Sequence, residues 1–271
     1  MGKEIIRTLT IAGLDASGGA GLIADISTFE EFGTYGQAVL TTVVTMDPEN
    51  WNHQVKGLPL DLLKQQIETI LTSDVPIKAM KTGMLGSKEI VELARETIER
   101  AKIEKTVIDP VLVCKGTDEV LNPDTAVALR ELLMPIAYVA TPNIFEAGQM
   151  ADLPTPKTLA EIEAAAKAIH DRGVQYVVVK GSRHLDPESA LDLFYDGKSF
   201  EWLAKPKLEN PATHGAGCTF AAAITAGLAN DLEPLEAVKK AKDYVYIAIK
   251  NGFAYNKFVS PVYRPAYKEY R

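Results

Sequence analysis

Length, composition and charge exclude several classes of protein. The chain has 271 residues, 46% of them hydrophobic and 24% charged, which is enough apolar material for the core of one large domain. A net charge of −7 disfavours nucleic acid and membrane surfaces as partners, because both attract a basic face. No apolar run could span a membrane, and two cysteines do not make a disulfide framework. We expect a soluble, cytoplasmic, single-domain protein covering residues 1–271.

Short β-branched runs alternate along the chain with longer segments of helical period. The predicted strands are 7–12, 38–44, 77–81, 106–109, 137–140 and 176–180. The predicted helices are 21–32, 60–71, 88–101, 123–133, 159–172, 218–230 and 234–251. This alternation predicts an α/β fold with a parallel sheet and helices on both of its faces.

Two segments depart from the alternation. Residues 190–202 hold two β-rich runs on either side of Asp196-Gly197, and such a pair is a strong β-hairpin signal. The residues after 251 are rich in Tyr and Pro, and we expect an irregular tail there.

Glycine and polar residues follow the predicted strands at the points where those strands end. The sequences are Gly13-Leu14-Asp15, Thr82-Gly83-Met84, Asp109-Pro110, Thr141-Pro142-Asn143 and Gly181. Open α/β sheets bind their ligands outside the carboxyl ends of the strands. The sequence therefore predicts one active site at this edge of the sheet.

Two glycine-rich loops stand directly before predicted helices. The first, residues 12–21, is neither a Walker loop nor a clean dinucleotide fingerprint, and a tight strand–helix turn explains it equally well. The second places small residues and Cys218 at a helix start, where N–H groups and the helix dipole favour a thiolate and suit phosphoryl transfer. A packing turn with an inert, buried cysteine is the alternative, and the presence of both loops argues against it.

An amide and two charged side chains complete the candidate site. Asn143 and Glu146 lie three residues apart on one face of a predicted helix. Asn143 is a good N-cap that needs no ligand, and Glu146 is a candidate to hold Mg²⁺ or its water. Lys180 ends an apolar strand, where it either reaches a phosphate or is simply exposed to solvent.

Taken together and in this order, the motifs resemble the hydroxymethylpyrimidine kinase branch of the ribokinase-like superfamily. The matching segments are 13–21, 81–85, 109–111, 141–146, 180–181 and 214–220. The resemblance implies a three-layer αβα ribokinase-like fold and a homodimer. It also implies transfer of the γ-phosphate of ATP, with Mg²⁺, to a hydroxymethyl group on a small heteroaromatic ring.

The same resemblance implies a role for each matching residue. Cys218 would be the base, beside an anion hole formed by Gly215, Ala216 and Gly217. The acceptor would contact Gly13, Asp15, Asp25, Met84 and Val111. ATP would contact Asn143, Lys180, Gly181, Thr213 and His214. Magnesium would be held by Asp109 and Glu146. Leu14 departs from the branch, which usually has Ser or Thr there, and this removes a possible hydroxyl contact beside Asp15.

Met46 and Cys114 bear on which acceptor is used. Kinases of the thiamin pathway in this branch usually have Gln at the Met46 position, facing an aminopyrimidine, and Met offers no hydrogen bond. With Cys114, Met46 resembles a subgroup of pyridoxal kinases in which the loop 113–117 is a lid whose thiolate adds to the aldehyde. On the residues alone, an incidental Cys114 is as good an interpretation.

The acceptor implied by this subgroup is the 5′-hydroxymethyl group of pyridoxal, with pyridoxine and pyridoxamine as further substrates. Hydroxymethylpyrimidine and its monophosphate, or both activities together, are the alternative. A ligand-binding sensor without catalysis is a third, disfavoured by the presence of Cys218, Glu146 and Lys180.

Overall fold

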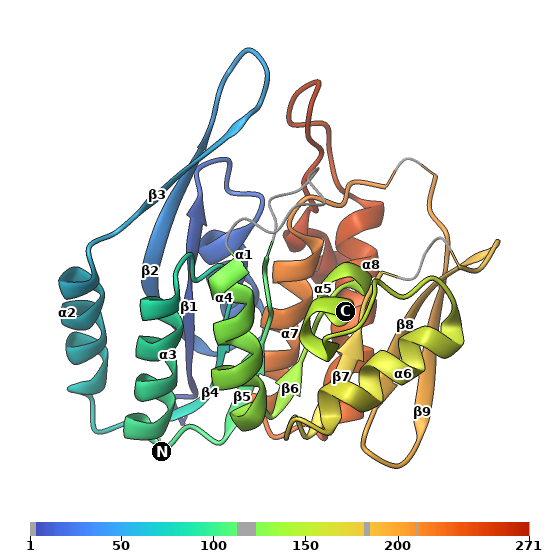
Figure 1. Ribbon diagram of the computed structural model, residues 1–271. Helices are drawn as coiled ribbons and strands as arrows, with labels where there is room; N and C mark the ends of the chain where they lie inside the picture. Colours follow the sequence, from blue (N-terminus) through green and yellow to red (C-terminus); the bar gives the residue numbers. More distant parts are fainter. Residues whose placement is uncertain (1–3, 113–122, 182–184, 210, 271) are drawn as a thin grey trace.

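A nine-stranded sheet forms the centre of the computed structural model (Figure 1). The structure describes residues 4–112, 123–181, 185–209 and 211–270. The strands are β1 (Arg7–Asp15), β2 (Tyr35–Met46), β3 (His53–Gly57), β4 (Ile77–Thr82), β5 (Lys105–Ile108), β6 (Val139–Ala140), β7 (Tyr176–Val179), β8 (Ser189–Tyr195) and β9 (Phe200–Pro206). Their order in the sheet is β3-β2-β1-β4-β5-β6-β7-β8-β9.

The six strands from β2 to β7 pair in parallel, and the three outer strands are antiparallel to their neighbours. The hairpin predicted around Asp196-Gly197 is confirmed as β8–β9. Strand β3 was not predicted, because an exposed edge strand with the sequence His-Gln-Val-Lys-Gly carries no alternation of apolar and polar residues. The mostly parallel α/β sheet predicted from the sequence is confirmed.

Helices cover both faces of this sheet. They are α1 (Gly21–Glu31), α2 (Leu60–Leu71), α3 (Lys88–Ala101), α4 (Pro123–Ala128), α5 (Ile144–Ala151), α6 (Leu159–His170), α7 (Ala216–Ala229) and α8 (Pro234–Lys250). A π-helical turn at Leu129–Leu133 continues α4, and the tail expected to be irregular ends in a 3-10 helix at Arg264–Tyr270. Among the described residues, no helix has both the length and the apolar character to cross a membrane.

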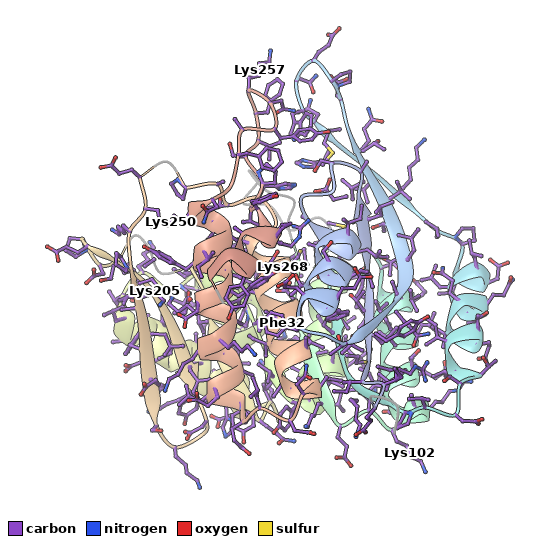
Figure 2. All side chains as sticks on the ribbon, turned by 180° about the vertical axis from the view of Figure 1, so that it is seen from behind. Phe32, Lys102, Lys205, Lys250, Lys257 and Lys268 are labelled. Carbon is purple, nitrogen blue, oxygen red and sulfur yellow. The ribbon has the colours of Figure 1, made fainter. Side chains whose placement is uncertain are left out.

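Two hydrophobic clusters show which helices cover which face. One cluster joins α2, α3, α4, α5 and α6 to the sheet, and these helices lie in front of it in Figure 1. The other joins α1, α7 and α8 to the opposite face, which Figure 2 shows from behind. The structure is therefore the three-layer αβα fold that the family resemblance implies.

The central strands are buried on both faces, but the two faces differ in chemistry. On β1, Leu9 and Ile11 belong to the cluster under α2 and α3. Thr8 and Thr10, which point the other way, are fully buried polar residues on the side of α1 and α7. A buried polar side chain requires hydrogen-bond partners, so further polar groups are expected between the sheet and the helices α1 and α7.

Two segments rise above the carboxyl ends of the parallel strands. One is the β2–β3 hairpin and the other is the loop after α8, and Figure 1 shows them side by side at the top of the molecule. The Trp51 ring stacks on Phe258, with ring centroids 6.0 Å apart, and also contacts Tyr255. Aromatic packing thus joins a hairpin near the amino terminus to a loop near the carboxyl terminus.

Candidate active site

Two adjoining cavities open at the carboxyl ends of the parallel strands. The first has a volume of about 330 Å³, and the second, of about 280 Å³, lies toward β8 and α8. Both are lined by Lys180, Thr213 and Gly217. The single site that the sequence predicts at this edge therefore consists of two cavities that meet at the start of α7.

Most of the predicted site residues line the first cavity. From the amino-terminal half they are Gly13, Asp15, Met46, Met84, Asp109 and Val111. From the carboxyl-terminal half they are Asn143, Glu146, Lys180, Thr213, His214, Gly215, Gly217 and Cys218. The second cavity is lined by Gly181 and Ala216, together with the apolar side chains of Phe220, Val245 and Ile249.

The two glycine-rich loops touch at Gly215, the N-cap of α7. Its φ of 80° lies in the left-handed region that favours glycine. A Cβ atom at Gly215 would lie 1.9 Å from the carbonyl oxygen of Gly19, so no other residue fits there. The Ala216 N–H donates to the Thr213 carbonyl, whereas the N–H groups of Gly217 and Cys218 belong to the first helical turn, which has no acceptor within the helix. Donors for an anion therefore face the junction of the two cavities.

Cys218 lies in the first turn of α7, partly open to the cavity, and accepts a hydrogen bond from the backbone of Gly21. The helix start predicts a low thiol pKa, but the structure gives the opposite direction. Burial and the charge of Asp25 raise the pKa of Cys218 to about 11, and the charge of Lys81 opposes them only in part. The expected resting thiolate is therefore wrong, and the free protein holds Cys218 as a thiol.

The pH dependence of Cys218 alkylation checks this assignment. Since only the thiolate reacts with iodoacetamide, the rate should still rise about tenfold per pH unit between pH 8 and pH 10. A thiol with the ordinary pKa of 9.0 would begin to level off in that range. The measurement uses a Cys114→Ser background, because the chain has two cysteines, with glutathione as the reference thiol. A rate that is already level at pH 9 would contradict the raised pKa.

Asp15 and His214 join the two glycine-rich loops through their side chains. His214 Nε2 lies 2.6 Å from Asp15 Oδ2, and both side chains are almost fully buried. Burial alone would raise the pKa of Asp15, but hydrogen bonds from His214 and Ser17 outweigh it and lower that pKa. His53, which the sequence did not single out because β3 was not predicted, also lines this cavity. His214 is expected from the sequence to contact ATP. In the structure it lies beside Asp15 in the first cavity and does not line the second.

Arg264, in the 3-10 helix after α8, holds the first glycine-rich loop from behind. Its two terminal guanidinium nitrogens donate to the carbonyl oxygens of Gly18 and Gly19, each at 2.9 Å. Sequence reasoning missed this residue because it lies in the tail expected to be irregular. The contact spans 245 positions of the chain, and no local pattern signals it.

Asp25 is not part of the cavity wall, which corrects the role expected for it. Its side chain is fully buried in α1 and forms an ion pair with Lys81 Nζ at 2.9 Å. Lys81 itself does line the cavity. The sequence held a signal for Lys81, since strand alternation puts it on the same face as the buried Ala79, where a lysine requires a partner.

Asp109, Lys180 and Glu146 form a charged group where the cavities meet. Lys180 Nζ lies 2.5 Å from Asp109 Oδ1, and Thr141 also donates to that oxygen. Asn143 and Glu146 form a capping box at the start of α5, so the N-cap interpretation of Asn143 is confirmed. Burial raises the pKa of Glu146 to about 7, and Lys180 opposes that shift.

These two carboxylates fit Mg²⁺ as kinases use it. In the described part of the chain, no three His, Cys, Asp or Glu side chains converge into a cage for a metal ion. Magnesium in such enzymes is held by one or two carboxylates together with phosphates and water, so a cage is not required. Glu146 and Asp109 are both buried beside the cavity, and hard oxygen donors are the chemistry this ion prefers.

The second cavity has a polar edge on β8. Lys242 Nζ donates to Asp192 Oδ2 at 2.6 Å and to the Ala190 carbonyl, while Asp192 Oδ1 accepts from the Gly181 N–H. Neither Asp192 nor Lys242 was expected from the sequence, because each lies in an element predicted without a functional motif. Cys114 falls outside the described residues, so its role stays a prediction.

Comparison with known proteins places the chain in a family. Residues 15–263 match the phosphomethylpyrimidine kinase family. The chain belongs to this family. It is 49% identical over 256 residues to the pyridoxine kinase of Bacillus subtilis strain 168, a match that covers 94% of each chain. It is 34% identical over 265 residues to the hydroxymethylpyrimidine/phosphomethylpyrimidine kinase of the same organism, with 98% and 97% covered.

Solved structures of kinases in this family share the fold over nearly their whole length. An ADP complex of Bacillus subtilis pyridoxal kinase has a TM-score of 0.93 at 47% identity, with 98% of this chain and 99% of that one covered. Pyridoxal kinase from Staphylococcus aureus in complex with AMP-PCP and pyridoxal has a TM-score of 0.91 at 45% identity, with 97% and 95% covered. The ribokinase-like architecture expected from the motifs is thus confirmed.

Proposed function

We propose that the protein is an ATP- and Mg²⁺-dependent kinase that phosphorylates the 5′-hydroxymethyl group of pyridoxal. The observation that carries this proposal is the pair of adjoining cavities that meet at the start of α7. A two-substrate transfer requires such a junction, because acceptor and donor must come together in line. Relatives that are pyridoxine and pyridoxal kinases at 45–49% identity support the same choice.

The acceptor would occupy the first cavity. Met46 and Met84 give it an adaptable apolar wall, while Asp15 and His214 give it a polar one. The hydroxymethyl group would point to Cys218, which would take its proton as the new O–P bond forms. Because the free thiol has a raised pKa, its proton must pass to solvent before this step. A loose transition state makes only a modest demand on the base.

The nucleotide would extend into the second cavity, with its phosphates at the junction. There the first-turn N–H groups of α7 and the ammonium of Lys180 would stabilise the transferring group. Lys180 Nζ would lie 3.5 Å from a Cβ atom placed on Gly217, so lysine and helix start face the same space. Asp109 and Glu146 would hold Mg²⁺, which would neutralise charge on the phosphates.

The proposed preference for pyridoxal over hydroxymethylpyrimidine depends on Met46. In this structure Met46 ends β2 and lines the first cavity, where it offers no hydrogen bond to an amino group on the ring. The hydroxymethylpyrimidine kinase of Bacillus subtilis is a more distant relative, at 34% identity. Both observations favour a pyridine acceptor.

A side-by-side kinase assay tests the proposal. Pyridoxal, pyridoxine, pyridoxamine and hydroxymethylpyrimidine are supplied separately with ATP and Mg²⁺, and the phosphorylated products are quantified. We expect the highest kcat/KM for pyridoxal, with hydroxymethylpyrimidine at least tenfold lower. A higher kcat/KM for hydroxymethylpyrimidine would favour the thiamin-pathway alternative, and no turnover of any of the four would favour a sensor.

Replacing Arg264 by alanine should weaken acceptor binding specifically. The guanidinium fixes the carbonyls of Gly18 and Gly19, so its loss should raise the KM for pyridoxal about tenfold, about 1.4 kcal/mol. The KM for ATP should stay within twofold, since the nucleotide would occupy the other cavity. Initial rates measured against each substrate check this, with Arg100→Ala, which removes a surface partner of Glu68, as the control. Equal increases in both KM values would contradict the assignment.

The homodimer implied by the family resemblance stays part of the proposal. Sedimentation equilibrium of the purified protein tests it: a dimer has twice the chain mass of 29.5 kDa. A monomer at micromolar concentration would remove it without affecting the proposed reaction.

A further inference from the structure

The Asp25–Lys81 ion pair is the most deeply buried charge pair in the described part of the chain. Both side chains have an exposed fraction of 0%, and their charged atoms lie 2.9 Å apart. Thr10, the register partner of Lys81 on β1, donates to the same carboxylate oxygen at 2.7 Å. The three residues belong to α1, β1 and β4, so the pair depends on tertiary packing alone.

The pair lies on the face of the sheet that carries α7. Thr10 and Lys81 point away from the cluster under α2 and α3, and α7 packs against α1, β4 and β5 on this side. Cys218 belongs to the first turn of α7, and Lys81 and Cys218 both line the first cavity. Both charges of the ion pair therefore lie close enough to the thiol that would accept the proton to interact with it electrostatically.

Stability does not explain such a pair well. Removing two charges from water costs several kcal/mol for each ion, and apolar replacements of buried ion pairs are often neutral or stabilising. Here one oxygen of Asp25, Oδ1, is buried without a hydrogen-bond partner, so the pair is not fully satisfied. An incompletely satisfied pair beside a reactive group indicates an electrostatic function.

We propose that Lys81 is a positioning residue whose ammonium stabilises the thiolate of Cys218, and that Asp25 holds this ammonium in place and limits its effect. The inference rests on the proposed base function of Cys218. In the reaction the acceptor O–H bond breaks as the S–H and O–P bonds form, and the bond from the γ-phosphorus to the bridging oxygen of ATP breaks, so that ADP leaves with its electron pair. The negative charge on sulfur therefore exists only before the transfer. Lys81 makes this charged state accessible, and Asp25 opposes it.

Other charged groups also interact with Cys218 and contribute to its pKa. Asp109 lies at the end of β5 and raises the pKa of the thiol together with Asp25. Lys180, directly after β7, and Arg264, in the carboxyl-terminal segment, are the further cations that interact with it. Glu146 acts through Lys180. None of these groups changes in the variants below, so differences between variants report on Asp25 and Lys81.

The two partners predict opposite effects, which makes the inference testable without any substrate. The probe is an aromatic disulfide reagent, whose reaction rate with Cys218 is measured at pH 8 in a Cys114→Ser background. Lys81→Met should slow the reaction and Asp25→Asn should accelerate it, each by about threefold. A change of one unit in the pKa alters the thiolate population about tenfold. A thiolate of lower pKa is also a weaker nucleophile, by about threefold per unit, so the net change in rate is about threefold.

Two further variants separate charge from structure. Lys81→Arg keeps the positive charge and should remain within twofold of the parent rate. Lys105→Met removes another strand lysine from an ion pair, with Asp231, at the opposite end of the sheet and should change nothing. Melting curves followed by circular dichroism identify any variant that fails to fold. If Lys81→Met does not fold, Asp25→Asn and Lys81→Arg carry the test.

Opposite shifts for Lys81→Met and Asp25→Asn, with Lys81→Arg close to the parent, are the expected result. Shifts in the same direction, or rates equal to that of Lys105→Met, would overturn the inference. Kinase assays add a separate readout: Lys81→Met should lower kcat with little change in the KM for ATP. Because the reagent assay contains no substrate, failure of the proposed kinase activity would leave its outcome unaffected.

Discussion

Replacement of Cys218 by alanine is expected to lower kcat for pyridoxal about 10²–10⁴-fold. This range is the usual contribution of a positioned proton acceptor, and the loose transition state of phosphoryl transfer does not remove the need for one. Nucleotide binding should change little, because the N–H groups at the start of α7 come from the backbone and remain. Steady-state kinetics together with calorimetric titration of ADP measures both effects.

Two variants serve as controls for this result. Thr225→Ala alters a buried side chain two turns further along α7 and should leave kcat within a few-fold, provided the protein folds. Cys218→Asp supplies a carboxylate base at the same position, and we expect it to recover part of the lost rate. Near-normal turnover by Cys218→Ala would remove the base assignment altogether.

Replacement of Lys180 by methionine should have the second largest effect, on both activity and stability. The ammonium is the expected donor to the transferring group, and losing one such donor typically costs 10²–10³ in kcat. It also neutralises Asp109 and Glu146, and breaking a buried pair by removing one partner costs about 3–5 kcal/mol of unfolding free energy. Kinetics and urea denaturation measure the two effects independently.

The stability loss should depend on pH with a definite sign. Without Lys180, the pKa of Glu146 rises further above its value in the unfolded chain. The folded state then binds more protons than the unfolded state, so stability falls as pH rises. Lys180→Met should therefore be more destabilised at pH 8 than at pH 5.5. The surface variant Lys239→Met should show no such trend, and a pH-independent loss would contradict the predicted charge balance.

Much of the architecture could be predicted because it follows from local patterns. The helices at 60–71 and 88–101 have the predicted bounds, since both combine a regular apolar stripe with clear ends. The hairpin at Asp196-Gly197 follows from turn chemistry. By contrast, β3 is an exposed edge strand whose ladder bonds come from β2, and its own residues carry no pattern.

The residue types and their order by themselves determined the fold class, the edge of the sheet that carries the site, and most of the residues that line it. These follow because strand ends, glycine-rich helix starts and polar residues are local features of a chain. Only the tertiary structure decided how charges act on one another. Asp25 was expected in the cavity wall but forms a buried ion pair with Lys81. The Cys218 thiol has a raised pKa although it lies at a helix start. The physical reason is that burial and charge–charge distances depend on residues far apart in sequence, as between Asp15 and His214.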